Sequence, residues 1–219
     1  MEIILCVPFS VIKIMADKIN GPSLISISGQ DVHWEEWGAY TGEISPPMLA
    51  DLGAKFCMIG HSERRKYFDE TDEMVNKKAL ALLKSGVRPI VCIGETLEER
   101  QLGLTINILE KQLRVCFNRL SSAYLEKTAI LYEPRWAIGT GNVANSDQIA
   151  EAHHYIRKEL ERLFSAQSAD RTRIIYGGSV TPDNIAAISK IEDVDGVGVG
   201  RASLDLPNFL RIVNAIPNA

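Results

Sequence analysis

Short runs of apolar and β-branched residues recur along the chain, and each is followed by a stretch in which apolar residues return at helical spacing. The runs are IILCVP (3–8), LISIS (24–28), FCMIG (56–60), PIVCIG (89–94), AILYE (129–133), RIIYG (173–177) and GVGVG (196–200). Continuous apolar runs of this length are typical of strands buried on both faces in a parallel sheet covered by helices. The alternation therefore predicts an α/β fold.

Two of the intervening helices can be placed by their apolar faces. One is predicted to end at Gly86 and the other to begin after Ser146, which is a plausible N-cap. The apolar faces consist of Val75, Ala79, Leu82 and Leu83 in the first helix and of Ile149, Ala152, Ile156, Leu160 and Leu163 in the second. No composition break or linker interrupts the chain, so we expect one domain over residues 1–219.

The number of strands favours a closed α/β barrel with one unit absent. Such a barrel has eight strands and about 250 residues, so this chain falls short by roughly one βα unit. It enters its first strand almost at once, which places the shortage at the front. We therefore expect seven of the eight βα units, with IILCV and GVGVG facing an unfilled position between them.

Composition and charge narrow the class of protein. The 219 residues are 46% apolar and 24% charged, with a formal net charge of -4, which gives no electrostatic reason to expect nucleic acid or an anionic membrane as partner. The apolar run after Met1 is too short for a signal peptide or a membrane span. Three of the four cysteines, Cys6, Cys57 and Cys92, interrupt strand-like runs, which is typical of reduced core cysteines. We expect a cytoplasmic protein.

In a parallel α/β barrel, reactive side chains gather where strands end and loops begin. Glu133 ends the AILY run and suits a general base, because a carboxylate shielded from water has a raised proton affinity. A salt-bridged structural glutamate is the alternative. The neighbouring sequence favours the base: Pro134 stiffens one end of the next segment, Gly139 and Gly141 free its other end, and Trp136 begins an apolar stretch. Such a segment can close as a lid.

His61 follows FCMIG and precedes a helix that we expect to begin at SERR. The positive end of a helix dipole favours a neutral imidazole, which can donate a hydrogen bond to a carbonyl. A structural histidine is the alternative. His33, His153 and His154 lie elsewhere and receive no catalytic role. With one strand-end histidine and no acidic or cysteine cluster, we expect no zinc or iron site.

Two glycine-rich segments, GGSVTPD and GVGRASL, follow the last two strands and are candidates for binding phosphate. Each is expected to open into a helix, the first with Thr181 as N-cap and Pro182 in the first turn, the second starting at Ala202 and Ser203. Proton abstraction beside the carbonyl of a small sugar phosphate would use this combination of groups: a base, a neutral electrophile, a lid and a phosphate-binding site. Schiff-base chemistry is disfavoured, because no lysine ends a strand.

Several long motifs now point to one family. The segments GAYTGEISPPMLADLGAKFCMIGHSERR, VCIGETLEER, YEPRWAIGTG, RIIYGGSVTPDN and DVDGVGVGRASL together resemble triosephosphate isomerase, in that family's order and spacing over essentially the whole chain. The resemblance implies a (β/α)8 barrel that interconverts dihydroxyacetone phosphate and D-glyceraldehyde 3-phosphate in glycolysis and gluconeogenesis. It also implies a homodimer that uses no cofactor and no metal.

Carried over by position, the resemblance implies a role for each motif residue. Glu133 becomes the carbon base, His61 the neutral electrophile, Glu63 a carboxylate of the active site and Ser62 a supporting residue. The implied substrate contacts are Gly139, Gly177, Gly178, Ser179, Gly200 and Arg201, the implied lid residues are Pro134, Arg135, Trp136, Ala137, Ile138 and Thr140, and the implied dimer contacts are Tyr40, Thr41 and Glu43.

The chain departs from the family pattern in three places. The family's first strand carries an asparagine and a lysine that point into the site; we expect no counterpart of it in residues 1–219, and its absence would remove a cation from beside the reacting oxygens. Arg201 replaces the second of two glycines, and Arg135 replaces a small apolar lid residue. These departures leave two alternatives open: a sister isomerase of a tetrulose phosphate, or an impaired barrel that binds a phosphate or a protein.

Overall fold

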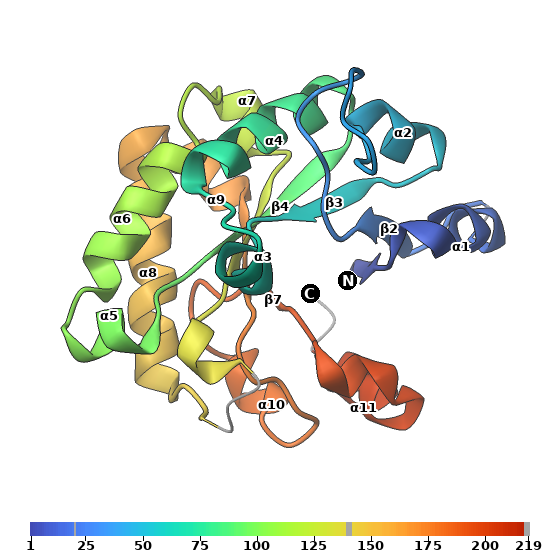
Figure 1. The fold of residues 1–219 in the computed structure, drawn as a ribbon. Helices are drawn as coiled ribbons and strands as arrows, with labels where there is room; N and C mark the ends of the chain where they lie inside the picture. The colour runs from blue at the N-terminus through green and yellow to red at the C-terminus, as the bar shows by residue number, and fades with distance from the viewer. Residues whose placement is uncertain (20, 139–141, 217–219) are drawn as a thin grey trace. The chain divides into compact units, whose positions relative to one another are not determined.

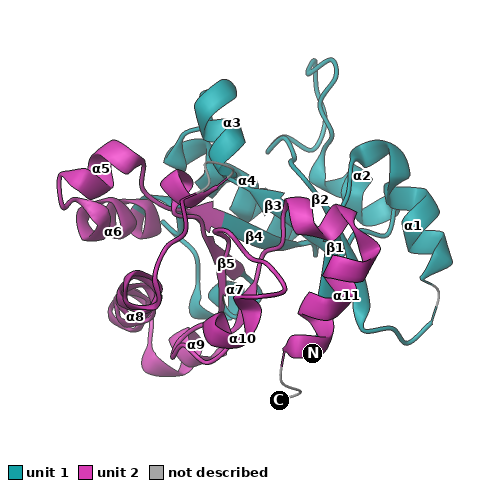
Figure 2. Ribbon diagram, turned by 90° about the horizontal axis from the view of Figure 1, so that it is seen from below, with its two compact units in different colours: residues 1–91, 115–128 teal, residues 92–114, 129–219 magenta. Residues whose placement is uncertain are grey.

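The computed structural model describes residues 1–19, 21–138 and 142–216, in which strands and helices alternate along the chain (Figure 1). The backbone divides into two compact units (Figure 2). Unit 1 comprises residues 1–91 and 115–128, and unit 2 comprises residues 92–114 and 129–219. Strand β4 and helix α6 each cross the division, because their residues fall on both sides of it.

Unit 1 is built on parallel strands that follow chain order. They are β1 (Ile3–Cys6), β2 (Ile25–Gly29), β3 (Phe56–Ile59) and the first residues of β4 (Arg88–Ile93). Ile3 lies beside Ile25, Ser28 beside Phe56, and Phe56 beside Arg88. The helices of this unit are α1 (Ile12–Lys18) after the 3-10 turn η1 (Phe9–Val11), α2 (Pro46–Asp51), α3 (Ser62–Tyr67), α4 (Asp72–Lys84) and α7 (Ser122–Leu125).

Helix α4 forms as the sequence predicts. The hydroxyl of Thr71 caps its start by accepting the backbone N–H of Met74 at 3.2 Å. Beyond its end, Gly86 has a φ of +76°, a left-handed conformation that favours glycine. The apolar face predicted for this helix is buried and packs on β3. This confirms the assignment of the segment between the third and fourth strands.

Unit 2 contains the last residues of β4 and three further parallel strands, β5 (Ala129–Tyr132), β6 (Arg173–Tyr176) and β7 (Gly196–Val197). Ala129 lies beside Arg173, and Ile175 beside Gly196. All of β5 is buried. The helices are α5 (Leu97–Gln101), α6 (Thr105–Cys116), α8 (Ser146–Leu163), α9 (Ala166–Arg171), α10 (Ile185–Ile188) and α11 (Leu206–Ala215), with the 3-10 turns η2 (Arg135–Ala137) and η3 (Arg201–Leu204).

Three predicted helix starts are wrong. Asn145, not Ser146, caps α8, because its side chain accepts the N–H of Gln148 while the Gln148 side chain accepts the N–H of Asn145. The segment after Thr181 forms a turn, and α10 begins only at Ile185. At the last helix, Ala202 and Ser203 belong to η3, and α11 begins at Leu206 with Asp205 as its cap.

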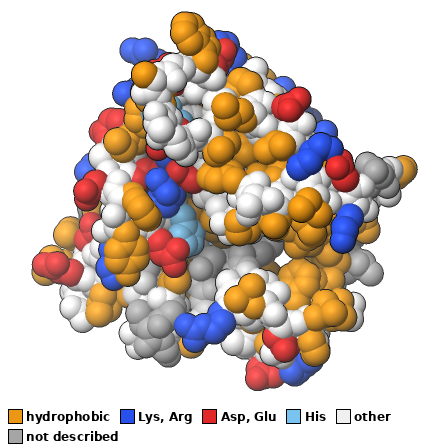
Figure 3. All heavy atoms as spheres, turned by 45° about the vertical axis from the view of Figure 1, so that its right-hand side comes forward, with side chains coloured by type: hydrophobic (Ala, Val, Ile, Leu, Met, Phe, Trp, Pro, Cys, Tyr) orange, Lys and Arg blue, Asp and Glu red, His pale blue; other side chains and the backbone are white. Residues whose placement is uncertain are grey.

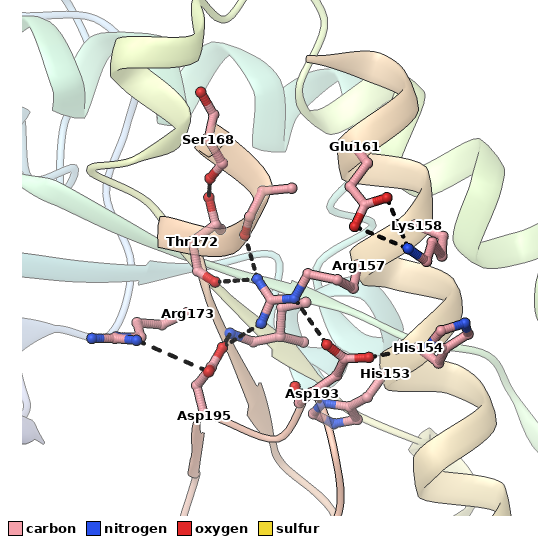
Figure 4. A network of polar contacts seen from close by, with 12 residues as sticks. His153, His154, Arg157, Lys158, Glu161, Ser168, Thr172, Arg173, Asp193 and Asp195 are labelled. Atoms are coloured by element: carbon pink, nitrogen blue, oxygen red, sulfur yellow. Dashed lines mark hydrogen bonds and ion pairs between the residues drawn. The ribbon is translucent and has the colours of Figure 1, made fainter. Parts of the chain in front are cut away.

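A partly buried ionic network connects α8 to the loop before β7 (Figure 4). The guanidinium of Arg157 donates to a carboxylate oxygen of Asp193 at 3.2 Å and to one of Asp195 at 2.7 Å. It also donates to the carbonyl of Thr172 at 2.7 Å. One arginine of α8 thereby holds the end of α9 and the loop that leads into β7.

The predicted strand positions are confirmed, although the last strand is shorter than the GVGVG run and ends at Val197. The cysteines Cys6, Cys57, Cys92 and Cys116 are all free thiols. Acidic and basic side chains are interspersed on the face drawn in Figure 3. Among the described residues, no helix combines the length and the hydrophobicity that crossing a membrane requires.

Candidate active site

In unit 2, the carboxyl ends of parallel strands meet at one edge of the sheet. Glu95 lies just beyond β4, and Glu133 directly follows β5. The loop after β6 carries Gly177, Gly178 and Ser179, and the loop after β7 carries Gly200 and Arg201. Because β5, β6 and β7 are neighbours in register, the strand-end residues of this unit lie along the same edge.

Glu133 is closely packed between two glycines, Gly94 and Gly177. It is 4% exposed, and its N–H donates to the carbonyl of Ile93 at 2.7 Å. A Cβ on Gly94 would lie 1.9 Å from the carbonyl oxygen of Glu133, and a Cβ on Gly177 would lie 3.1 Å from the Glu133 Cγ. Both glycines are therefore required for the close approach of neighbouring strands to this carboxylate residue.

Glu95 is a buried carboxylate that joins β4 to the predicted lid. Its side chain is fully buried and accepts the indole N–H of Trp136 at 2.8 Å and the hydroxyl of Tyr132 at 3.1 Å. Arg100 approaches the same carboxylate at 3.4 Å. Burial, followed by the charge of Glu95, raises the pKa of the Tyr132 hydroxyl well above its usual value. This phenol therefore stays protonated and donates to Glu95.

Glu95 has no role among the sequence predictions, although it lies within the VCIGETLEER segment. The signal was present: VCIGE places a glutamate just after a buried strand, as AILYE does with Glu133. What the sequence did not contain was the direction of the Trp136 indole, which depends on how the chain turns after Pro134.

The first part of the predicted lid is well packed. Residues 135–137 form η2, in which Trp136 and Ala137 are buried, and the N–H of Arg135 donates to the carbonyl of Glu95 at 3.0 Å. Trp136 and its neighbours are thus fixed to the loop after β4 through backbone and side chain. The predicted substrate contact Gly139 and the predicted lid residue Thr140 lie outside the described residues.

The two phosphate-binding candidates have contrasting local structure. After β6, Asn184 accepts the N–H of Thr181 at 2.8 Å and donates to the carbonyl of Ser179 at 2.9 Å, so the loop is braced from within. Gly178 lies against the Tyr176 hydroxyl, where a Cβ would be 2.1 Å from the oxygen. After β7, Arg201 is exposed at the start of η3.

In unit 1, the histidine that follows β3 has a defined hydrogen-bonding state. The Nδ1 atom of His61 accepts the backbone N–H of Glu63 at 3.3 Å. A backbone N–H can only donate, so this contact requires a lone pair on Nδ1 and favours the ring form with its proton on Nε2. The carboxylate of Glu63 is mostly exposed and lies 3.7 Å from the same nitrogen. Ser62 is the first residue of α3.

The remaining predicted site residues form an exposed loop of unit 1. Tyr40, Thr41 and Glu43 all lie on the surface, where the N–H of Glu43 donates to the carbonyl of Tyr40. The ring of Tyr40 packs on that of His33, with centroids 4.3 Å apart. The loop therefore presents its side chains outward from a small aromatic base.

Comparison with known proteins decides the family. The sequence model of the family described as triosephosphate isomerase matches residues 1–216. The chain belongs to the triosephosphate isomerase family. Triosephosphate isomerase of Citrifermentans bemidjiense is 49% identical over 213 residues, covering 97% of this chain and 84% of that protein. The enzyme of Moorella thermoacetica is 46% identical, covering 97% of this chain and 85% of its own length.

A solved structure extends the comparison to the fold. The crystal structure of triosephosphate isomerase from Bartonella henselae matches with a TM-score of 0.89 at 34% identity, covering 98% of this chain and 86% of that one. The predicted fold class is confirmed: an α/β fold of the barrel type of this family, with seven parallel strands among the described residues.

Proposed function

We propose that the protein is a triosephosphate isomerase, which interconverts dihydroxyacetone phosphate and D-glyceraldehyde 3-phosphate. The observation that carries this proposal is the similarity of 97% of the chain to relatives named triosephosphate isomerase, at 46–49% identity in the two proteins described above. The chain carries the glutamate and the histidine of the motifs, Glu133 and His61, whereas Arg135 and Arg201 depart from the family pattern. The reaction moves one proton between adjacent carbons and one between their two oxygens, and it needs no net oxidation.

In this reaction Glu133 acts as the carbon base. Its carboxylate takes a proton from C1 of dihydroxyacetone phosphate, leaving an enediolate, and the same group returns a proton to C2. Burial of the residue and its place at the end of β5 support this role. A base kept from bulk water avoids hydration that would otherwise have to be removed before each proton transfer.

His61 acts as the electrophile. The ring donates from Nε2 to the substrate carbonyl oxygen, where negative charge develops as the carbon loses its proton. The hydrogen bond from the Glu63 N–H to Nδ1 supports this role, because it leaves the ring proton on the other nitrogen. Ser62 and Glu63 belong to the turn that sets this geometry.

The loops after β6 and β7 bind the phosphate group, through Gly177, Gly178 and Ser179 in one loop and Gly200 and Arg201 in the other. Glycines at these positions let backbone N–H groups approach an anion. The segment of residues 134–140 closes over the substrate and keeps water from the enediolate. The bond between Trp136 and Glu95 supports a defined resting position for its first half.

The test is turnover by the purified chain in both directions, with Glu133→Gln as the matched control because it keeps the shape and removes the base. We expect conversion by the wild type and a loss of about 10³-fold or more in kcat for the variant, within the range of a general base and its positioning. Equal rates in the two proteins would remove Glu133 from the mechanism. Faster turnover of a four-carbon ketose phosphate than of the triose would favour the sister isomerase.

The same proposal includes a homodimer in the cytoplasm. The exposed loop with Tyr40, Thr41 and Glu43 supports a contact with a second copy, and four free thiols suit a reducing compartment. Light scattering should give twice the chain mass of 24.3 kDa. Thr41→Arg should shift the protein toward monomer, whereas a change at the exposed Lys66 should leave the mass unaltered.

A further inference from the structure

The turn that carries His61 contains a glycine whose N–H and carbonyl are both hydrogen-bonded to side chains. Gly60 joins β3 to His61 and has a φ of +73°, in the left-handed region. Its N–H donates to Oε1 of Glu70 at 3.3 Å, and its carbonyl accepts from Nε of Arg65 at 2.7 Å. A glycine has two unusually free backbone dihedrals, and these contacts hold the peptide planes on either side of it.

The side chains that bind Gly60, those of Arg65 and Glu70, also form ion pairs with residues of α4. Arg65 donates to the carboxylate of Asp72, in the first turn of that helix, at 2.6 Å. Glu70 accepts from Lys78, also on α4, at 2.8 Å and from Arg64 at 3.1 Å. Glu70 is 5% exposed, and the Arg65 side chain is 8% exposed. Ion pairs with this little exposure have restricted freedom to rearrange.

We propose that Arg65 and Glu70 are positioning residues, which lock the Gly60 turn so that the His61 ring is presented in one orientation. The plane of the Gly60–His61 peptide sets the direction in which the His61 side chain leaves the backbone. Only with that direction fixed does Nδ1 of His61 meet the N–H of Glu63, a contact that leaves the ring proton to Nε2. The inference rests on the proposed function for its kinetic consequence, but the ring orientation can be measured without it.

Arg65→Lys separates the hydrogen bond to the Gly60 carbonyl from the positive charge of the side chain. Lysine has a methylene where arginine has Nε, so the variant loses the donor to Gly60 and keeps a cation that can pair with Asp72. Asp72→Asn is the control for a weakened ion pair, because it leaves Nε of Arg65 in place. A second matched pair is Glu70→Ala and Asp31→Ala: both carboxylates bind Lys78 and Arg64, but only Glu70 contacts Gly60.

Two readouts are taken on the full chain below its melting temperature. The ¹⁵N chemical shifts of the four histidine rings, with His61 assigned by its absence in His61→Gln, report whether one Nε2–H tautomer is held. We expect a single tautomer in the wild type and averaged shifts in Arg65→Lys and Glu70→Ala. Steady-state kinetics should show a fall in kcat of roughly 10- to 100-fold, with KM within about twofold, in these two variants only.

The outcomes are separable. Averaged His61 shifts in Arg65→Lys and Glu70→Ala, with wild-type shifts in Asp72→Asn and Asp31→Ala, support the proposal. Unchanged His61 shifts in Arg65→Lys, or equal effects in the controls, overturn it and leave a purely structural ion network. If the wild type fails to isomerise triose phosphates, the proposed function falls, and the ring spectra alone then decide the positioning role.

Discussion

His153 makes the stability of unit 2 depend on pH. It is fully buried on α8, with its Nδ1 3.1 Å from the carbonyl oxygen of Asp193 and its ring edge-on to Tyr132. Burial lowers the pKa of His153 from 6.5 to about 4. The hydrogen bond with the Asp193 carbonyl and the charges of Asp195 and Asp193 oppose this shift, and the charge of Arg157 adds slightly to it. The folded protein therefore keeps this imidazole neutral where the unfolded chain protonates it.

The sign and size follow from proton linkage. Above pH 6.5 the residue is neutral in both states and contributes nothing to the pH dependence. As the pH falls from 6.5 to about 4, only the unfolded state takes up the proton, so the native state loses stability at up to about 1.4 kcal/mol per pH unit. The pKa values give a loss of about 2.5 kcal/mol at pH 4.5 relative to pH 7.

The assay is urea unfolding at pH 7 and pH 4.5, followed by Trp136 fluorescence in a Trp34→Phe, Trp37→Phe background, where this is the remaining indole. His153→Phe keeps a ring of similar size and removes the titration. It should reduce the drop in unfolding free energy between the two pH values by about 2 to 3 kcal/mol. His154→Ala is the control, because this neighbour is exposed and should alter the drop by less than about 0.5 kcal/mol.

Carboxylates also titrate in this pH range, but their contribution to the unfolding free energy cancels when the variants are compared. The same pH-dependent drop in wild type and His153→Phe would refute the reasoning, because it would mean that this imidazole has the same pKa in both states. A drop reduced equally by His154→Ala would assign the effect to Asp193, which contacts both histidines.

Two further variants test the close packing around Glu133 and the hydrogen bond that holds Trp136. A third variant, Gly86→Ala, is the control for the first. Gly94→Ala should destabilise the protein by about 3 kcal/mol or more in urea unfolding, because its Cβ would lie 1.9 Å from the Glu133 oxygen, whereas Gly86→Ala, with open space around it, should lose only about 1 to 2 kcal/mol. Trp136→Phe removes the donor to the buried Glu95 carboxylate and should lower the unfolding free energy by about 2 kcal/mol; an unchanged midpoint would mean that this bond contributes nothing.

The strands and the apolar helix faces were predictable because buried positions are occupied by apolar residues, which recur in the sequence with the spacing of a strand or a helix. The α4 face and the β5 run are examples in which every predicted apolar residue is buried. Helix starts were less predictable where two capping residues are adjacent. Asn145 and Ser146 both suit an N-cap, and only the reciprocal bond with Gln148 decides between them.

The candidate site was predictable at strand ends and not beyond them. Glu133 and His61 follow apolar runs directly, so their positions can be inferred from the sequence alone. Glu70 and Arg65 contact Gly60 from later in the chain, and no local pattern marks which charged residues turn inward after α3 begins. Such contacts depend on tertiary packing, which hydrophobic periodicity does not record.

The central claim is that Glu133 transfers a proton between two carbons of a triose phosphate. It is tested most directly by running the reaction in D₂O and following the product by proton NMR. The wild type should convert dihydroxyacetone phosphate to glyceraldehyde 3-phosphate with deuterium at C2, because the base exchanges its proton with solvent before returning it. Glu133→Gln should give neither conversion nor labelling at a comparable rate. Labelled product formed equally fast by the variant would contradict the assignment.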